Sequence, residues 1–433
     1  MKSFRPILLL VACLILLPGN AQDPAPELEP AGQYQLVVEG FDWGPAVNKV
    51  VLEFGRELEA VPEGAFTVMA TRKTDLAEIP EAYASGERTV IGSYISDSRG
   101  IRKDKGEHVT LILSVGPRMP LASPFHYANN DRVRGNFWVD YRVTVSQTPG
   151  HRSWTWMTGI IMPQAGRFNL LGKYEYTPGE MMSYAAYAPP GSEGKKPLII
   201  WLHGGGEGGT DPTIALLGNR AANYASAEIQ QYFGGAFVLV PQAPTFWMNA
   251  EGGGYTRGDK EDIYNKGLMA LIKDYVAANP RIDTDRIYVG GCSNGGYMSL
   301  KLILKEPRYF AGGYISALAY HNVNISDAQV RSIRDVPIWF IHAKDDPVTV
   351  PEETVVPLYG RLMAAGAKNV HFSYYDHVTD ITGQYGGKDF RYNGHWSWIY
   401  SHANTATLDF DGKPVTVDGM PVTVMQWLAA QKR

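Results

Sequence analysis

One serine of this chain stands where a nucleophile could stand, in the segment Gly291-Cys292-Ser293-Asn294-Gly295. The segment follows the apolar run 287–290 and precedes a run of good helix formers at 297–304. A serine at a sharp turn between strand and helix exposes its hydroxyl, and small neighbours are needed because the turn is tight and the helix packs closely against it. We therefore predict that Ser293 is a nucleophile, and that Cys292 beside it is a small buried side chain.

A serine hydroxyl is a weak nucleophile, so it needs a histidine base and an acid that orients the base. After an elbow of this kind the expected chain order is serine, acid, histidine. Two adjacent aspartates, Asp345 and Asp346, follow the predicted strand 338–341. Asp346 directly precedes Pro347 at the start of the loop, and we prefer it as the acid over Asp345.

Four histidines follow these aspartates. His371 lies inside a predicted strand, so we expect it to be packed. His377 stands just after that strand, where a base could sit. His395 lies in a loop with a glycine hinge and several aromatic residues, Asn393-Gly394-His395-Trp396-Ser397-Trp398. The residues alone leave both His377 and His395 as possible bases.

A glycine run, Leu202-His203-Gly204-Gly205-Gly206-Glu207, follows the predicted strand 198–202. Glycines let the backbone approach a substrate closely, so the amides of Gly205 and Asn294 are candidates for stabilising a negatively charged oxygen in the transition state. A phosphate-binding loop is the alternative, but no Lys-Ser/Thr pair follows the glycines. Glu207, Trp247 and Trp396 are candidate substrate-binding residues.

The elements that must position these groups fall into two patterns. Short β-branched or aromatic runs separated by Gly and Pro predict an antiparallel sandwich in the first part of the chain. From about residue 169, apolar runs alternate with helical segments such as 263–278, which predicts a doubly wound, mostly parallel sheet. The expected strands are 34–39, 49–54, 66–71, 89–95, 108–115 and 137–145, then 198–202, 237–240, 287–290, 338–341 and 370–375.

The N-terminus has the pattern of a secretory signal, in which a basic start precedes the apolar run 7–17 and small residues up to Ala21. We expect cleavage after Ala21 and export to the periplasm or the medium, and consider lipidation at Cys13 a weaker alternative. The run is too short to span a bilayer, so no stable membrane insertion is expected. After cleavage Cys292 is the remaining cysteine, so we expect no intrachain disulfide.

The composition narrows the class of partner. A formal net charge of −4 over 433 residues provides no basic surface for nucleic acid or an anionic membrane. No cluster of His, Cys and Asp has the spacing of metal ligands, so we predict no metal and no cofactor. Small-molecule or polymer substrates are the expected partners.

Four motifs together resemble the α/β-hydrolase serine esterases: His203-Gly204-Gly205-Gly206, the elbow 291–295, Asp346-Pro347 and Gly394-His395-Trp396. More narrowly, Val240-Pro241-Gln242-Ala243-Pro244 with Trp247, and the segment from His395 to Trp398, resemble polyhydroxybutyrate-depolymerase-like and prolyl-oligopeptidase-like esterases with an N-terminal immunoglobulin-like domain. The expected organisation is a signal peptide at 1–21 and a linker at 22–32, followed, as the resemblance implies, by an immunoglobulin-like β-sandwich at 33–165 and an α/β-hydrolase domain at 166–433.

The same resemblance implies a carboxylic-ester hydrolase that forms an acyl-enzyme, with Ser293, Asp346 and His395 as its triad. It favours His395 over His377, although the interval from the preceding strand to His395 is unusually long. A serine peptidase of the prolyl-oligopeptidase-like type is the first alternative. A polymer- or carbohydrate-binding protein with a degenerate hydrolase domain is the second.

Overall fold

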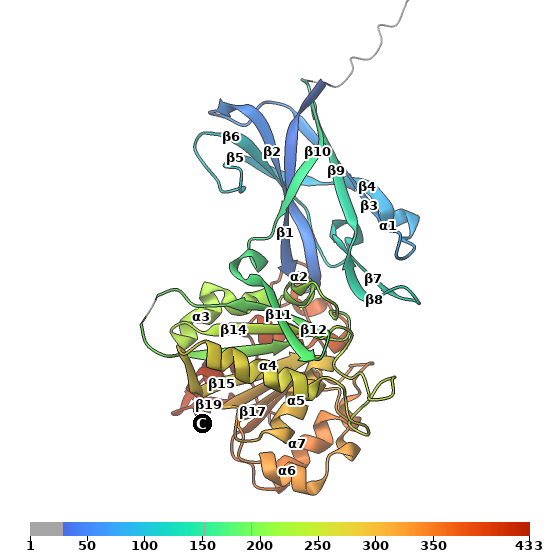
Figure 1. Ribbon diagram of the computed structural model, residues 1–433. Helices are drawn as coiled ribbons and strands as arrows, with labels where there is room; N and C mark the ends of the chain where they lie inside the picture. Colours follow the sequence, from blue (N-terminus) through green and yellow to red (C-terminus); the bar gives the residue numbers. More distant parts are fainter. Residues whose placement is uncertain (1–28, 151, 192) are drawn as a thin grey trace, which may run out of the picture.

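The computed structural model describes residues 29–150, 152–191 and 193–433, and it contains two large β-sheets in separate domains (Figure 1). The predicted signal peptide, its cleavage after Ala21 and the alternative lipidation at Cys13 lie outside the described residues. Strand β1 (Glu29–Phe41) begins inside the segment 22–32 that was expected to be a linker.

The N-terminal domain is all-β in outline, as predicted, and its eight-stranded sheet has the order β4-β3-β9-β10-β1-β2-β6-β5. Neighbouring strands are antiparallel, except that β1 and β10 run parallel. Burial alternates along β9, where Tyr141, Val143 and Val145 face the core. One helical turn, α1 (Glu81–Ala84), was not expected. The other strands are β2 (Gly44–Leu58), β3 (Ala65–Lys73), β4 (Ser85–Arg88), β5 (Val90–Ser96), β6 (Gly106–Leu113), β9 (Asp140–Thr148) and β10 (Arg152–Ile161).

A separate hairpin of the N-terminal domain reaches the second domain. It consists of β7 (Phe125–Asn129) and β8 (Arg134–Trp138), and Figure 1 shows it extending from the upper domain toward the lower one. Trp138 stacks edge-on against Phe125, and its indole N–H donates a hydrogen bond of 3.0 Å to Thr213 Oγ1 of the second domain. The base of the hairpin is therefore bonded directly to the second domain.

The second domain has the predicted doubly wound, mostly parallel sheet, in the order β11-β12-β14-β13-β15-β16-β17-β18. The strands from β14 to β18 in this order run parallel, whereas β11 and β12 form an antiparallel edge. The bounds are β11 (Asn169–Thr177), β12 (Glu180–Tyr187), β13 (Lys196–Leu202), β14 (Phe237–Gln242), β15 (Ile282–Cys292), β16 (Gly312–Ser316), β17 (Ile338–Ala343) and β18 (Val370–Tyr375).

Helices cover both faces of this sheet, which explains the nearly continuous apolar composition of its strands. Along β13, Leu198 and Ile200 pack toward one face, and Ile199 and Trp201 pack toward the other. The first face carries α4 (Asn265–Ala278), α5 (Asn294–Lys305), α6 (Asp327–Ile333) and α7 (Val355–Ala364). The second carries α2 (Pro212–Leu217), α3 (Ala227–Phe233), α8 (Trp398–His402) and α9 (Val424–Ala430).

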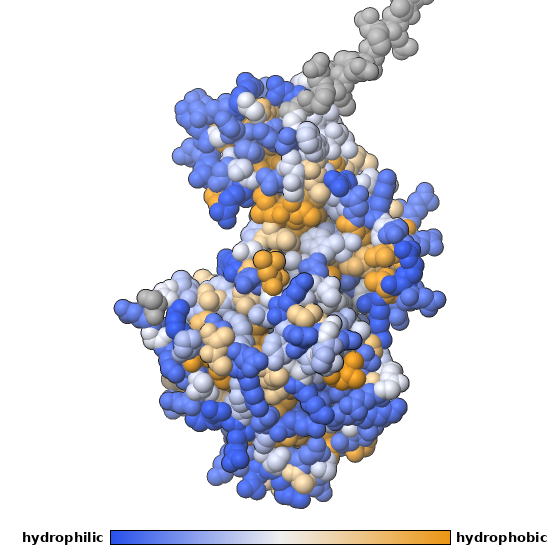
Figure 2. All heavy atoms as spheres, in the orientation of Figure 1, coloured by the Kyte–Doolittle hydropathy of each residue, from blue (hydrophilic) through white to orange (hydrophobic). Residues whose placement is uncertain are grey.

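The two domains pack against each other through apolar contacts. One continuous cluster of buried apolar side chains extends from the N-terminal core, through Val38, to Leu217 on the second domain. Figure 2 shows apolar side chains gathered near the narrow junction between the domains. An ion pair of 2.7 Å between Asp42 and Arg220 also crosses this junction. The N-terminal domain is thereby held close to the carboxyl ends of the parallel strands.

Two features are absent from the part of the chain that the structure describes. None of their helices has both the length and the apolar character needed to cross a bilayer. Within the same ranges, no group of three or more His, Cys, Asp or Glu side chains is arranged to hold a metal ion.

Candidate active site

Ser293 lies at the turn between β15, which ends at Cys292, and α5, which begins at Asn294. Its backbone has φ +54° and ψ −114°, a conformation that side chains rarely adopt. A Cβ on Gly291 would lie 2.5 Å from the Gly295 carbonyl, and a Cβ on Gly295 would lie 1.9 Å from the Leu202 oxygen. Only glycine fits at both positions, so the chain forms the expected strand–serine–helix turn.

The structure brings His395 to Asp346. His395 Nδ1 lies 2.9 and 3.1 Å from the two carboxylate oxygens of Asp346, which is buried. The same carboxylate accepts hydrogen bonds from the backbone and hydroxyl of Thr349 and lies 3.0 Å from His342 Nε2. Burial alone would raise the pKa of Asp346. The hydrogen bonds from His342 and His395 outweigh this effect and hold the pKa of Asp346 well below its usual range. Asp346 is therefore ionised and fixed in orientation.

The two alternative residues form a pair of their own. His377 Nδ1 lies 2.7 Å from Asp345 Oδ2, and the two side chains are 33% and 39% exposed. Neither residue lines either of the two cavities at Ser293. The chain therefore has two neighbouring His–Asp pairs, of which the His395–Asp346 pair lies at the cavities that Ser293 lines.

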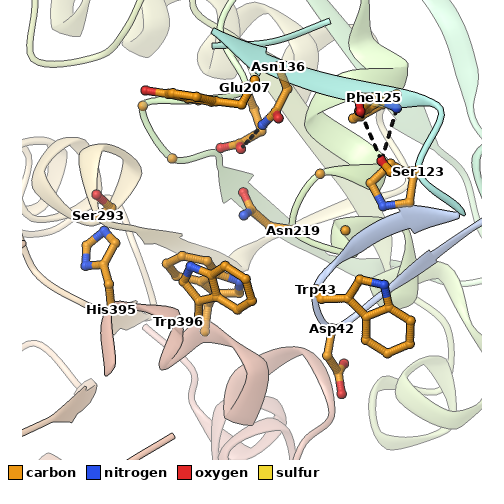
Figure 3. Close-up of a pocket in the computed structure, with 18 residues that line it drawn as sticks. Asp42, Trp43, Ser123, Phe125, Asn136, Glu207, Asn219, Ser293, His395 and Trp396 are labelled. Atoms are coloured by element: carbon orange, nitrogen blue, oxygen red, sulfur yellow. Dashed lines mark hydrogen bonds between the residues drawn. The ribbon is translucent and has the colours of Figure 1, made fainter. Parts of the chain in front are cut away.

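Ser293 and His395 both line two adjoining cavities of about 350 and 370 Å³. In Figure 3 the imidazole of His395 lies beside Ser293. Because Nδ1 is occupied by Asp346, the other ring nitrogen, Nε2, is available to exchange a proton with the serine. The hydrogen bond between a nucleophile and its base often tightens only when substrate binds.

The glycine loop lies against the first turn of α5. A Cβ on Gly205 would be 3.2 Å from Asn294 Nδ2, so the two predicted amide donors are on neighbouring segments. The Asn294 amide has no acceptor inside its own helix because it is in the first turn. His203 supports the loop: its Nε2 accepts from the Ala243 amide at 3.0 Å, so Nδ1 carries the proton and donates to the Gly204 carbonyl at 2.6 Å. Burial lowers the pKa of His203 to about 4, which keeps the ring neutral.

The first cavity is lined on both sides by aromatic rings, and the N-terminal domain supplies several of them. Trp396, one of the candidate substrate-binding residues, lines it. No sequence signal indicated the contribution of the N-terminal domain, because the residues are distant in the chain and belong to no motif. The aromatic residues of the lining are Trp43, Phe125, Tyr127, Trp396 and Trp398.

The long interval between β18 and His395 also reaches the N-terminal domain. Tyr385, within this interval, packs edge-on against Trp43 with ring centroids 4.9 Å apart, and its hydroxyl donates to the Val115 carbonyl at 3.5 Å. This interval therefore forms a contact between the domains beside the first cavity.

Trp247 does not contact either cavity, contrary to the prediction. Its side chain has no exposed surface and packs against His203 and Tyr264, with ring centroids 5.1 and 6.1 Å away. An aromatic residue near a motif is as suited to the core as to a pocket wall, and the sequence does not distinguish the two. Trp247 therefore supports the glycine loop from behind, through His203. Cys292 is fully buried, as expected, and burial raises the pKa of its thiol.

Glu207 lies at the end of the glycine loop, lines the first cavity and is 6% exposed. Asn136 of the N-terminal domain donates a hydrogen bond of 3.0 Å to Glu207 Oε1 (Figure 3). Burial raises the pKa of Glu207 to about 7, an effect that the hydrogen bond from Asn136 only partly offsets.

This shift predicts a pH dependence of stability. The folded protein keeps the proton on Glu207 up to about pH 7, whereas the unfolded chain releases it near 4.5, so the folded state binds more protons between these values. The stabilisation is complete below about pH 4.5 and is lost as the pH rises through 7. Relative to Glu207→Gln, the free energy of unfolding of the native protein should fall by roughly 3 kcal/mol between pH 4.5 and 8, at about 1.4 kcal/mol for each pKa unit.

Denaturant unfolding of both proteins across this pH range measures the difference. Glu251→Gln, at an exposed position, serves as the control and should parallel the native protein. Parallel pH profiles for the native and Glu207→Gln proteins would contradict the prediction.

Two family models match the chain. Residues 33–155 match the esterase Ig-like N-terminal domain, and residues 257–380 match the phospholipase/carboxylesterase family. The chain therefore combines an Ig-like N-terminal domain with a domain of the α/β-hydrolase fold. The second match includes Ser293 and Asp346 and ends before His395. This hydrolase also shares the fold of a thermostable esterase whose crystal structure covers 93% of this chain and 100% of its own, with a TM-score of 0.71 and 24% identity.

Two curated relatives match smaller parts of the hydrolase. NocK of Nocardia uniformis subsp. tsuyamanensis, which is named as an esterase, is 27% identical over 39% of this chain and 46% of its own length. Feruloyl esterase B of Neurospora crassa is 31% identical over 31% of this chain and 43% of its own length. The chain thus matches less than half the length of either relative.

Proposed function

We propose that this hydrolase is an exported carboxylic-ester hydrolase that acts through Ser293, His395 and Asp346 and an acyl-enzyme intermediate. One observation carries the proposal: His395 is bonded through Nδ1 to the buried Asp346 and borders the same two cavities as Ser293. The matched family is described as phospholipase/carboxylesterase, and both curated relatives are named as esterases. These names agree with an ester as the substrate. The secretory pattern that ends at Ala21 supports export.

In the first half of the reaction, Ser293 Oγ attacks the ester carbonyl carbon while His395 Nε2 accepts the hydroxyl proton. Asp346 stabilises the imidazolium that forms, because its carboxylate is already ionised and bonded to Nδ1. The oxygen of the tetrahedral intermediate becomes negative and accepts hydrogen bonds from the amides of Gly205 and Asn294. His395 then gives its proton to the departing alkoxide, which leaves as the alcohol, and the acyl group stays on Ser293.

In the second half, water takes the place of the alcohol. His395 removes a proton from the water as it attacks the acyl carbon, and then returns a proton to Ser293 Oγ as the acid is released. The aromatic lining of the first cavity suits an apolar or aromatic part of a small-molecule or polymer ester.

A serine-directed fluorophosphonate tests the nucleophile. Peptide mass spectrometry of the labelled protein should locate the adduct on Ser293, and the Ser293→Ala variant should remain unlabelled. An absence of label on Ser293 in the native protein would remove the serine mechanism.

Paired substrates test the reaction class. The hydrolase should cleave a series of ester chain lengths and act far more slowly on the matched amides. Efficient amide cleavage would instead favour the peptidase alternative.

A further inference from the structure

The second cavity at Ser293 differs from the first in charge. Both cavities share Ser293, His395 and the glycine loop, so a substrate bound at the serine has room to extend into both. The second cavity, however, is lined by two guanidinium groups, those of Arg134 and Arg257. Arg134 comes from strand β8 of the N-terminal domain, and Arg257 comes from the hydrolase domain.

Arg134 is held in place by aromatic rings and not by an acid. Its guanidinium carbon lies 4.1 Å from the ring centroid of Phe246 and 4.6 Å from that of Tyr255, and the two rings stack on each other. The guanidinium also donates a hydrogen bond to the Tyr255 hydroxyl. Among the described residues, no carboxylate lies within 4 Å of the Arg134 guanidinium. Stacking fixes the plane of the group and leaves donors for a further acceptor.

Arg257 is likewise paired with a neutral group. Its Nη1 lies 2.8 Å from His321 Nε2, and because arginine can only donate, this histidine nitrogen is the acceptor. Burial and the adjacent Arg257 both lower the pKa of His321, which keeps the ring neutral. Two acids are nearby: Glu353 lies 3.5 Å from His321 Nε2 with 56% of its side chain exposed, and Asp259 accepts from the backbone amide of Arg257. Within the described ranges, neither forms an ion pair with the Arg257 guanidinium.

We propose that the second cavity binds an anionic end of the substrate, so that the preferred substrates are esters carrying a carboxylate on the acyl or the alcohol side. The inference rests on the proposed ester hydrolysis at Ser293 and specifies its substrate class. Two guanidinium groups without carboxylate partners, beside the nucleophile, favour a ligand that brings a carboxylate, because the planar donors of arginine match its two oxygens. Since Arg134 belongs to the N-terminal domain, this domain takes part in selecting the substrate.

Matched ester pairs test the proposal on the full chain. On the acyl side, the mono-p-nitrophenyl ester of glutaric acid is compared with p-nitrophenyl pentanoate. On the alcohol side, 4-acetoxybenzoate is compared with 4-methylphenyl acetate. At low salt, kcat/KM should favour the anionic member of at least one pair, and the preference should weaken as salt is added.

The variant Arg134→Gln/Arg257→Gln should lower the ratio of anionic to neutral kcat/KM by about 10- to 100-fold, the range for hydrogen bonds to charged groups. Arg132→Gln is the matched control, since Arg132 lies in the same hairpin, pairs with Asp75 and does not line the cavity. A native enzyme with no preference in either pair, or a ratio that the double variant leaves unchanged, would overturn the proposal.

A binding measurement separates this proposal from the proposed reaction. Glutarate should bind the Ser293→Ala protein in isothermal titration calorimetry, and the additional Arg134→Gln/Arg257→Gln changes should weaken that binding by a similar factor. Glutarate binding without turnover of any ester would refute the proposed hydrolysis and support the anion site. Failure of glutarate to bind would overturn the anion site even where neutral esters are hydrolysed.

Discussion

Replacing His395 with alanine should lower kcat for ester hydrolysis by about 10⁴-fold or more, whereas replacing His377 with alanine should change it by less than about threefold. Both histidines contact an aspartate through Nδ1, at 2.9 and 2.7 Å, so the bond to an acid does not distinguish them. The distinction lies in position, because His395 borders the cavities with Ser293 and His377 does not. Loss of His395 leaves the serine without a base, and loss of His377 removes a half-exposed surface pair.

Asp346 and Asp345, the partners of the two histidines, allow the same comparison for the acid. Asp346→Asn should lower kcat by about 10⁴-fold, because an asparagine cannot stabilise the imidazolium and can hold the ring in the wrong tautomer. Asp345→Asn should have little effect on kcat.

Steady-state kinetics on one neutral p-nitrophenyl ester measures all four variants, with circular dichroism as the check on folding. If His377→Ala or Asp345→Asn proved to be the inactive variant, the base or the acid would be wrongly assigned. Such a result would leave Ser293 as the candidate nucleophile.

The sequence indicated those candidate site residues that directly follow a strand. Parallel strands of a doubly wound sheet end at the same edge, so Ser293 after β15 and Asp346 after β17 were expected to lie near each other. The sequence favoured Asp346 over Asp345, and the structure pairs Asp346 with His395 and Asp345 with His377. Strand β16 was not predicted, since its sequence Gly312–Ser316 begins with two glycines and lacks an apolar run.

Contacts between distant segments could not be predicted. Asn136 reaches Glu207 across 71 positions of sequence, and Arg134 reaches Tyr255 across 121. Neither pair belongs to a motif, and hydrophobic periodicity carries no information about how two domains dock. The walls of both cavities therefore include residues of the N-terminal domain that no sequence pattern indicated.

The second large effect is expected from Gly135, which lies far from the nucleophile in sequence. Its φ is +108°, and a Cβ there would lie 2.7 Å from the carbonyl oxygen of Gly206. The next residue, Asn136, donates its backbone amide to that same oxygen at 2.7 Å. Strand β8 therefore holds the glycine loop that contains Gly205, the proposed donor to the oxyanion.

Gly135→Ala should consequently lower kcat by about 10- to 100-fold, short of the 10²- to 10³-fold typical for complete loss of one oxyanion donor. The added methyl must push the hairpin away from the loop, which misaligns the Gly205 amide relative to Asn294. Gly150→Ala is the matched control, because Gly150 has a similar φ of +122° in the same domain but open space around its Cβ position. Backbone strain should cost each variant stability of the order of 1 kcal/mol, and the clash with the Gly206 carbonyl should cost Gly135→Ala more. Steady-state kinetics and thermal unfolding of the two proteins separate the effect on kcat from the effect on stability. Equal losses of kcat would mean that the hairpin does not hold the loop. A loss of kcat confined to Gly135→Ala would make the N-terminal domain a positioning element of the active site.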